Sequence, residues 1–286
     1  MITYKKLDVH GLQIFYREAG DASKPTILLL HGFPSSSHMY RDLIADLQDD
    51  FHLIAPDYPG FGFSSMPDKS EFSYTFDHIA QVMEQFIDQL GLKKFNLYVH
   101  DYGAPIGYRI ASKRPELIQS LLIQNANAYL EGLGPNLAAI PPFWTNRNAE
   151  TEEPIRGLLS LEGTKFQYLD GAENPENISP DAYYLDQYFL DRPGNSEIQL
   201  DLLFDYQNNV PLFDIWQQYF RQHQPSALII WGENDRFFVE AGARAYQKDL
   251  KDTEVHLVNS GHFALEEFHR EIAQHITHFL SKRNLK

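Results

Sequence analysis

Asp101 lies at the centre of the run Tyr98-Val99-His100-Asp101-Tyr102-Gly103-Ala104. A β-rich stretch, residues 95–99, leads into this run, and a helix-compatible stretch, residues 104–113, follows it. The order of strand, sharp turn and helix is typical of a nucleophile elbow, in which the central side chain projects from a strained turn above a sheet. That central residue is usually a serine, and here it is an aspartate. We therefore predict that Asp101 is a catalytic nucleophile.

An aspartate at this position changes the bonds that the site breaks. A carboxylate has an unperturbed pKa of about 3.9, so it is already ionised at neutral pH and needs no base to activate it. Its attack on an ester or amide would give an anhydride, which is a poor intermediate for hydrolysis. Its attack on a saturated carbon gives a stable alkyl ester that water then hydrolyses. The elbow therefore favours displacement at an sp3 carbon, such as that of an epoxide or an alkyl halide, over simple esterase chemistry.

A nucleophile elbow is followed along the chain by an orienting acid and then by a histidine. Asp235 comes just after the apolar stretch 227–231, and His262 comes just after the next strand-like stretch, 254–258. Open α/β sheets place their functional loops at these strand ends. We predict that Asp101, Asp235 and His262 form a catalytic triad, with His262 as the base.

The loop His31-Gly32-Phe33-Pro34 directly follows another apolar stretch, residues 26–30. In this architecture such a loop supplies one N–H of the oxyanion hole, and the residue after the nucleophile supplies the other. We predict that the N–H groups of Phe33 and Tyr102 fill these roles, and we place His31 in the substrate pocket. The donors matter when water attacks the ester and negative charge develops on its carbonyl oxygen.

The elements expected around these residues alternate between strands and helices. Strands are expected near residues 3–8, 12–18, 26–30, 51–55, 95–99, 120–124, 227–231 and 254–258, and helices near 37–47, 75–90, 104–113, 239–250 and 263–280. This alternation predicts an α/β fold with a mostly parallel open sheet and helices on both faces. The alternation breaks in the middle of the chain. We therefore predict a core formed by residues 1–126 and 213–286, and an inserted helical cap at 127–212.

The composition excludes several other classes of function. The net charge of −15 is spread along the 286 residues and disfavours nucleic-acid binding. The chain has no cysteine, so it has no disulfide, thiol nucleophile or thiolate metal site. It contains no signal-peptide pattern and no apolar run of membrane-spanning length. We expect a cytoplasmic monomer or homodimer that acts on a small apolar substrate, away from membranes, without a metal or organic cofactor.

These motifs together resemble the α/β-hydrolase superfamily, in the branch that holds epoxide hydrolases and haloalkane dehalogenases. The segments that carry the resemblance are His31-Gly32-Phe33-Pro34, the loop 57–64, His100-Asp101-Tyr102-Gly103, Asp235 and His262. The resemblance covers nearly the whole chain, and the cap matches loosely. It implies the triad above and a covalent ester on the aspartate.

The resemblance also indicates which residues would distinguish an epoxide substrate from a haloalkane. In epoxide hydrolases a pair of cap tyrosines protonates the oxygen of the opened epoxide. Two segments of this chain resemble those that carry the pair: Phe166-Gln167-Tyr168 and Tyr206-Gln207-Asn208. In the second segment Gln207 replaces the usual arginine. We therefore expect Tyr168 and Tyr206 to activate the substrate, with Tyr183 and Tyr184 as substitutes. Dehalogenases instead resemble one another in having a tryptophan directly after the nucleophile, where this chain has Tyr102.

The sequence thus favours an epoxide hydrolase that forms vicinal diols. A haloalkane dehalogenase is the main alternative, and its halide site could use Trp144, which we assign to the substrate pocket. A catalytically silent binding protein on a hydrolase scaffold is the alternative from another class.

Overall fold

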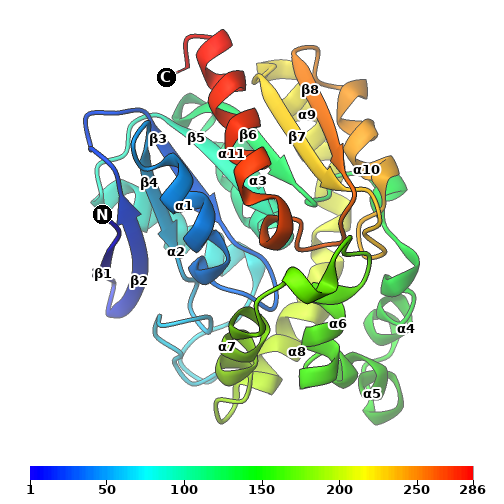
Figure 1. The fold of residues 1–286 in the computed structure, drawn as a ribbon. Helices are drawn as coiled ribbons and strands as arrows, with labels where there is room; N and C mark the ends of the chain where they lie inside the picture. The colour runs from blue at the N-terminus through cyan, green and yellow to red at the C-terminus, as the bar shows by residue number, and fades with distance from the viewer. Residues whose placement is uncertain (286) are drawn as a thin grey trace.

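The apolar stretches of the sequence form the strands of one sheet. In the computed structural model, which describes residues 1–285, the strands are β1 (Thr3–Val9), β2 (Leu12–Ala19), β3 (Thr26–Leu30), β4 (His52–Pro56), β5 (Phe95–His100), β6 (Ile118–Gln124), β7 (Ala227–Gly232) and β8 (Thr253–Val258). Their order across the sheet is β1-β2-β4-β3-β5-β6-β7-β8 (Figure 1). The pairs β1–β2 and β2–β4 are antiparallel, and all the other pairs are parallel. The predicted mostly parallel sheet is confirmed.

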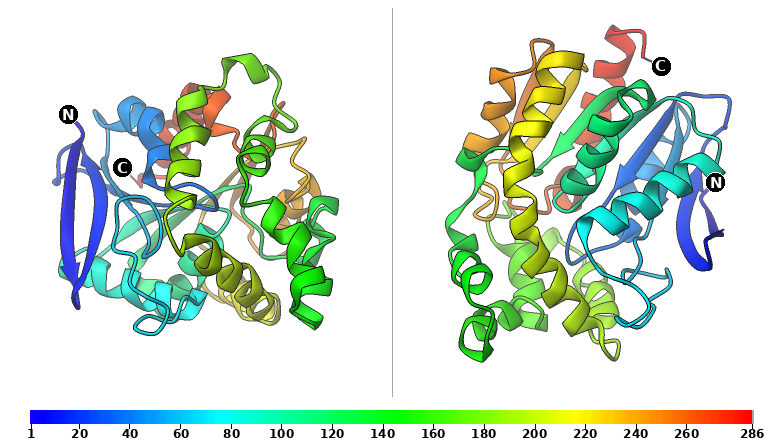
Figure 2. Two further views of the ribbon diagram at one scale, coloured as in Figure 1. Left: turned by 90° about the horizontal axis from the view of Figure 1, so that it is seen from below. Right: turned by 180° about the vertical axis from the view of Figure 1, so that it is seen from behind.

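Helices cover both faces of this sheet. The α-helices are α1 (Arg41–Leu47), α2 (Phe76–Gln89), α3 (Gly103–Lys113), α4 (Ile140–Thr145), α5 (Ala149–Gly157), α6 (Leu161–Leu169), α7 (Pro180–Leu190), α8 (Asn195–Asp205), α9 (Phe213–His223), α10 (Glu240–Ala245) and α11 (Leu265–Lys282). Helices α1 and α11 lie together on the face that is in front in Figure 1, and α2, α3 and α9 lie on the opposite face, which Figure 2 shows from behind.

The central strands are buried on both sides because helices cover both faces. Every residue of β4, β5 and β7 is buried, as expected for apolar parallel strands between two helical layers. The expected elements lie within two residues of the observed bounds. Two expected helices begin or end as 3-10 turns: Ser37–Tyr40 precedes α1, and Tyr246–Lys248 follows α10.

The chain between β6 and β7 leaves the sheet and forms the cap. Helices α4 to α8 gather below the sheet in Figure 1, and α9 returns the chain to the face of the sheet that α3 covers. The inserted helical cap is therefore present. The division of the chain at residues 126 and 213 stays a prediction, and the last residue of its second segment, Lys286, lies outside the described residues.

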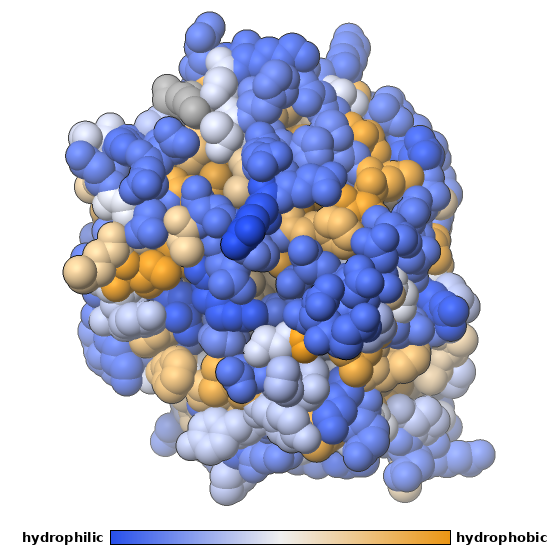
Figure 3. All heavy atoms as spheres, viewed as in Figure 1, coloured by the Kyte–Doolittle hydropathy of each residue, from blue (hydrophilic) through white to orange (hydrophobic). Residues whose placement is uncertain are grey.

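The surface in Figure 3 is mainly hydrophilic, with small apolar areas between polar side chains. Within residues 1–285, every helix is too short or too polar to cross a lipid bilayer.

Candidate active site

Asp101 occupies the tight turn between β5 and α3. Its backbone φ is 47°, a left-handed value that is uncommon for a residue with a side chain. The turn is tight because the start of α3 lies against β3: a Cβ on Gly103 would lie 2.1 Å from the carbonyl oxygen of Leu30. Gly32 has a similar role, because a Cβ there would lie 2.3 Å from the Cβ of Asp101. The two glycines let backbone pack around the strained aspartate and leave its carboxylate at the end of the sheet.

The two oxygens of the Asp101 carboxylate have different surroundings. Oδ1 accepts a hydrogen bond from the backbone N–H of Phe33 at 2.7 Å, and the N–H of Tyr102 also donates to the carboxylate. Oδ2 lies 3.8 Å from Nε2 of His262. Burial raises the pKa of Asp101 above its usual value, although His262 and the two N–H donors oppose this shift. The structure thus brings the predicted oxyanion-hole donors to the predicted nucleophile.

His262 is held between two carboxylates. Its Nδ1 lies 2.7 Å from Oδ2 of Asp235, and this contact places the ring proton on Nδ1 and leaves Nε2 free to face Asp101. Burial lowers the pKa of His262, but Asp235 and then Asp101 outweigh burial, so the net pKa is raised above 6.5. An imidazole in this arrangement accepts a proton at Nε2 while Asp235 stabilises the resulting cation.

Asp235 is itself fixed by the backbone and by a residue that the sequence analysis missed. Its Oδ1 accepts hydrogen bonds from the N–H groups of Phe237 and Phe238, at 2.7 and 3.0 Å. Its Oδ2 accepts a third bond from the side-chain amide of Asn125, at 2.8 Å. The Asn125 side-chain oxygen accepts from the N–H of Gly232, and its backbone oxygen accepts from the N–H of Asp101. Asn125 directly follows β6, so its place at a strand end was the available signal.

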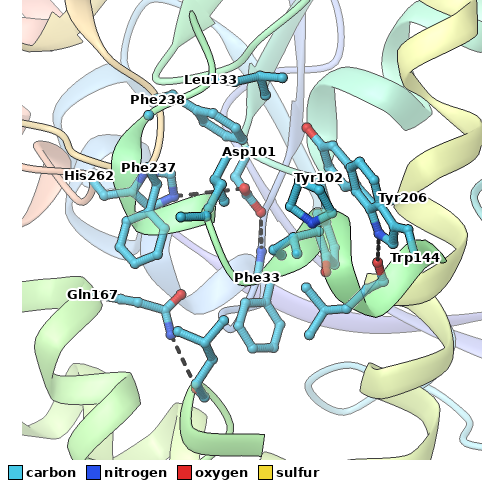
Figure 4. Close-up of a pocket in the computed structure, with 17 residues that line it drawn as sticks. Phe33, Asp101, Tyr102, Leu133, Trp144, Gln167, Tyr206, Phe237, Phe238 and His262 are labelled. Carbon is cyan, nitrogen blue, oxygen red and sulfur yellow. Dashed lines mark hydrogen bonds and ion pairs between the residues drawn. The ribbon is translucent and has the colours of Figure 1, made fainter. Parts of the chain in front are cut away.

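A cavity of about 200 Å³ lies between these residues and the cap. Its walls are mostly apolar and aromatic: Phe33, Asp101, Tyr102, Leu133, Gly134, Leu137, Ala138, Ile140, Pro141, Trp144, Leu158, Gln167, Leu203, Tyr206, Phe237, Phe238 and His262. In Figure 4 Asp101 lies between His262 on one side and Tyr206 and Trp144 on the other. The cavity thus suits a small, largely apolar molecule that lies against the carboxylate.

Comparisons with known proteins identify the family. Residues 25–268 match the family model described as the alpha/beta hydrolase fold. The chain belongs to the α/β-hydrolase fold family. An uncharacterised hydrolase of Saccharomyces cerevisiae is 42% identical to this α/β hydrolase over 278 residues, which cover 96% of the chain and 95% of the relative.

Two further relatives have names that specify a reaction. A cis-3-alkyl-4-alkyloxetan-2-one decarboxylase of Shewanella oneidensis is 28% identical, over 96% of this α/β hydrolase and 87% of the relative. A haloalkane dehalogenase of Mycobacterium tuberculosis is 40% identical over 113 residues, or 40% of this chain and 38% of the relative.

Solved structures share the fold at low sequence identity. Cfl2 from Burkholderia cenocepacia has a TM-score of 0.81 and 23% identity, with 97% of this chain and 95% of that chain covered. The epoxide hydrolase CorEH has a TM-score of 0.77 and 22% identity, with 99% of both chains covered.

Among the predicted pocket residues, Tyr206 and Trp144 line the cavity of this α/β hydrolase as neighbours. Their rings are parallel within 9°, with centroids 6.1 Å apart. The indole N–H of Trp144 donates to the carbonyl oxygen of Leu203 at 2.8 Å. The Tyr206 hydroxyl has no hydrogen-bond partner among residues 1–285, and burial and then the nearby Asp101 charge raise its pKa above 10. Tyr206 is therefore a protonated O–H donor that faces the nucleophile across the cavity.

The structure does not bring Tyr168 to this cavity. Its hydroxyl donates to the buried carboxyl group of Asp186 at 2.5 Å, and its ring stacks on Phe263 with centroids 3.9 Å apart. Consecutive residues of a helix point about 100° apart. On α6 this rotation turns Gln167 toward the cavity and Tyr168 toward the core. The expectation that Tyr168 activates the substrate is corrected accordingly, and Gln167 lies in the cavity wall in its place.

His31 is likewise absent from the cavity wall. Its ring is fully buried and stacks on Tyr58 at 4.0 Å between ring centroids. Nδ1 lies 3.0 Å from the carbonyl oxygen of Gly32, and Nε2 accepts from the N–H of Tyr58 at 3.3 Å. Burial lowers its pKa to about 3, so the imidazole is neutral. His31 therefore fixes the shape of the loop that carries Phe33, and its assignment to the substrate pocket is corrected.

Proposed function

We propose that this α/β hydrolase converts epoxides to vicinal diols through an alkyl ester on Asp101. In the first step Oδ2 of Asp101 attacks the less hindered ring carbon and forms a C–O bond. The ring C–O bond breaks, and its electron pair goes to the epoxide oxygen. The Tyr206 hydroxyl protonates this oxygen, which leaves a hydroxyalkyl ester and a tyrosinate that regains a proton from water.

The second step hydrolyses this ester. Nε2 of His262 takes a proton from a water molecule, and the resulting hydroxide attacks Cγ of Asp101. Charge then develops on Oδ1, the oxygen that already accepts from the Phe33 N–H, and the N–H of Tyr102 also donates to this carboxyl group. One such donor typically lowers the barrier by about 3 kcal/mol. Collapse of the intermediate breaks the Cγ–Oδ2 bond, and the leaving alkoxide takes the proton from His262, which releases the diol. The carboxyl group of Asp101, now with one oxygen from water, loses its proton to solvent and is again a carboxylate.

The observation that carries this proposal is the type of donor that faces Asp101. A departing halide needs N–H donors, whereas an opened epoxide needs a proton. The side-chain N–H groups in the cavity wall are engaged: that of Trp144 with Leu203, those of Gln167 with Leu158 and Gly163, and that of His262 on Nδ1 with Asp235. The Tyr206 hydroxyl is unengaged and proton-bearing, and so is the buried hydroxyl of Tyr102, which also lines the cavity. This set of donors supports epoxide opening.

A haloalkane dehalogenase is the second candidate, and a dehalogenase name among the relatives favours it. Both reactions use the same triad and differ in the group that leaves. A third substrate class follows from the name of the Shewanella relative, because an oxetan-2-one is a four-membered cyclic ester, strained as an epoxide is. All three classes would place a covalent adduct on the enzyme, so adduct mass distinguishes them.

The test is the intact-protein mass of a His262→Gln variant after incubation with small epoxides, 1-haloalkanes or β-lactones. The proposal predicts an added mass equal to the whole epoxide, located on Asp101 by peptide mapping. A bare alkyl adduct with halide release would transfer the assignment to a dehalogenase, and a lactone adduct alone would transfer it to the third class. A His262→Gln/Asp101→Asn double variant is the matched control and should carry no adduct.

A further inference from the structure

Gln167 is a polar residue of the cavity wall whose side chain the mechanism leaves unused. It lies on α6 in the cap, and only 4% of its surface is exposed. Its Nε2 donates to the carbonyl oxygens of Gly163, at 3.3 Å, and Leu158, at 3.4 Å. Its Oε1 receives no hydrogen bond from any residue in the described range 1–285, and it is not among the fully buried side-chain atoms that lack a partner. The small exposed part of this side chain therefore includes Oε1.

The two carbonyl contacts determine which end of the amide faces inward. If the amide were turned over, its oxygen would lie against two carbonyl oxygens and its NH₂ would lose both acceptors. In Figure 4 the Gln167 side chain extends from the cap toward the space beneath Asp101, with its oxygen directed inward. The residue therefore presents a fixed hydrogen-bond acceptor to an otherwise largely apolar cavity.

An acceptor of this kind discriminates between substrates. Asp101 attacks the substrate and Tyr206 protonates the epoxide oxygen, so neither side chain forms a hydrogen bond with Oε1 of Gln167. When a substrate displaces water from the cavity, Oε1 stays unpaired unless the substrate carries a donor, and an unpaired buried acceptor weakens binding. Most of the other wall residues, among them Leu158 and Leu203, have apolar side chains that donate no hydrogen bond to Oε1.

We infer that Gln167 is a specificity-determining residue that selects substrates with a hydroxyl group in addition to the reactive carbon. The inference rests on the proposed function only for the type of reactive group. If that group is an epoxide, the preferred substrate is an epoxide that also carries a hydroxyl group. The selection itself depends only on Gln167 and on the shape of the cavity. It therefore stays measurable with ligands that do not react.

The first experiment compares terminal epoxyalkanes with their ω-hydroxy counterparts of equal chain length, over several lengths. The wild type should favour the hydroxylated partner by about tenfold in kcat/KM at the best length, the penalty expected for one unpaired buried acceptor. In Gln167→Met, which keeps the length of the side chain and removes the acceptor, this ratio should fall to about one. Leu203→Met is the matched control, because it alters the wall without removing a polar group, and it should keep the wild-type ratio.

The second experiment uses non-reacting ligands and is independent of epoxide chemistry. Binding of a series of 1-alkanols and their methyl ethers is followed by the change in intrinsic tryptophan fluorescence, to which Trp144 in the cavity wall contributes. The alcohols should bind the wild type about tenfold more tightly than the ethers, and Gln167→Met should bind both alike. Equal binding of alcohols and ethers by the wild type, or an unchanged preference in Gln167→Met, would overturn the inference. Absence of epoxide turnover with a retained alcohol preference would instead reject only the proposed function.

Discussion

Nε2 of His262 and Oδ2 of Asp101 lie 3.8 Å apart, beyond hydrogen-bonding distance, while the other carboxylate oxygen is bound at 2.7 Å by the N–H of Phe33. The histidine therefore does not occupy the lone pairs that attack the substrate. It faces the carboxyl group at the position from which water must approach the ester. This geometry assigns attack to one oxygen and charge stabilisation to the other.

The nucleophile assignment predicts that Asp101→Asn loses activity by at least about a thousandfold, as replacement of a catalytic nucleophile does in other hydrolases. A neutral amide cannot form the ester, although it keeps the size of the side chain and its contact with Phe33. Steady-state hydrolysis and circular dichroism should be measured together. Full activity in a folded Asp101→Asn protein would reject the assignment.

Tyr206→Phe should slow the opening of epoxides by about a hundredfold or more, because it removes general-acid assistance to the leaving oxygen. The single-turnover rate of adduct formation is the informative measurement, since hydrolysis of the ester does not require this hydroxyl. Tyr168→Phe is the matched control, because Tyr168 lies outside the cavity wall and its loss should leave this rate nearly unchanged. Equal effects of the two variants would contradict the distinction drawn between them.

The pH dependence follows from the two charges beside His262. Asp235 and Asp101 raise its pKa above 6.5 against the effect of burial, and only the neutral imidazole accepts a proton from water. Activity should therefore fall as the pH decreases through the pKa of His262. Formation of the ester neutralises Asp101 and removes one of the two carboxylates, so the pKa of His262 should be lower in the intermediate than in the free enzyme.

This difference is measurable. The acid limb of kcat, under conditions where ester hydrolysis limits the rate, should lie at a lower pH than the His262 titration observed by NMR in the resting enzyme. If the acid limb coincided with the resting titration or lay above it, Asp101 would not be neutralised during turnover.

Asn125→Ala should slow the second step while sparing the first. Asn125 donates to Asp235 and accepts from the N–H of Gly232, so its loss frees the carboxylate that orients His262. A hydrogen bond to a charged group contributes about 1.5–3 kcal/mol, which corresponds to roughly a tenfold to hundredfold loss in ester hydrolysis. Rapid-quench experiments should show a normal burst of adduct formation and a slow steady state. A burst slowed as much as the steady state would indicate general damage to the site.

The positions of Asp101, Asp235 and His262 were predictable because strand ends of a parallel sheet meet at one edge, and the apolar strands are plain in the sequence. Asn125 follows the same rule, yet an asparagine after a strand has no distinctive chemistry until its partner in space is known. The hydrogen bonds of Trp144 to Leu203 and of Tyr168 to Asp186 join residues that are distant along the chain. No local pattern specifies such pairs.

The cap shows where periodicity fails. Helix α6 carries an aromatic, an amide and a second aromatic side chain at consecutive positions, Phe166, Gln167 and Tyr168, and its apolar residues are not confined to one face. The rotation of the helix is therefore set by tertiary contacts, chiefly the bond of Tyr168 to Asp186 and its stacking on Phe263. The segment resembling an epoxide-hydrolase tyrosine was identified, but the side chain that faces the cavity is its neighbour.

The buried Asp186 provides a stability prediction that is separate from catalysis. Burial raises its pKa to about 8, against hydrogen bonds from Tyr168 and Ser35 that favour the charged form. In the unfolded chain the same carboxyl has its ordinary pKa of about 3.9. Between these values the folded protein binds one more proton than the unfolded chain does, so this residue's contribution to the free energy of unfolding decreases as the pH rises.

Asp186→Asn removes this dependence and keeps an oxygen that accepts from Tyr168. Relative to the wild type, the variant should gain stability on the order of 2–4 kcal/mol between about pH 5 and pH 8, since one extra bound proton changes the free energy by about 1.4 kcal/mol per pH unit. Urea denaturation at both pH values is the measurement. The decisive quantity is the change in the variant-minus-wild-type difference with pH, because it cancels any constant effect of the substitution on packing. A difference independent of pH would mean that Asp186 is already ionised in the folded protein at about pH 5 and that its charge is stabilised where the cap meets the core.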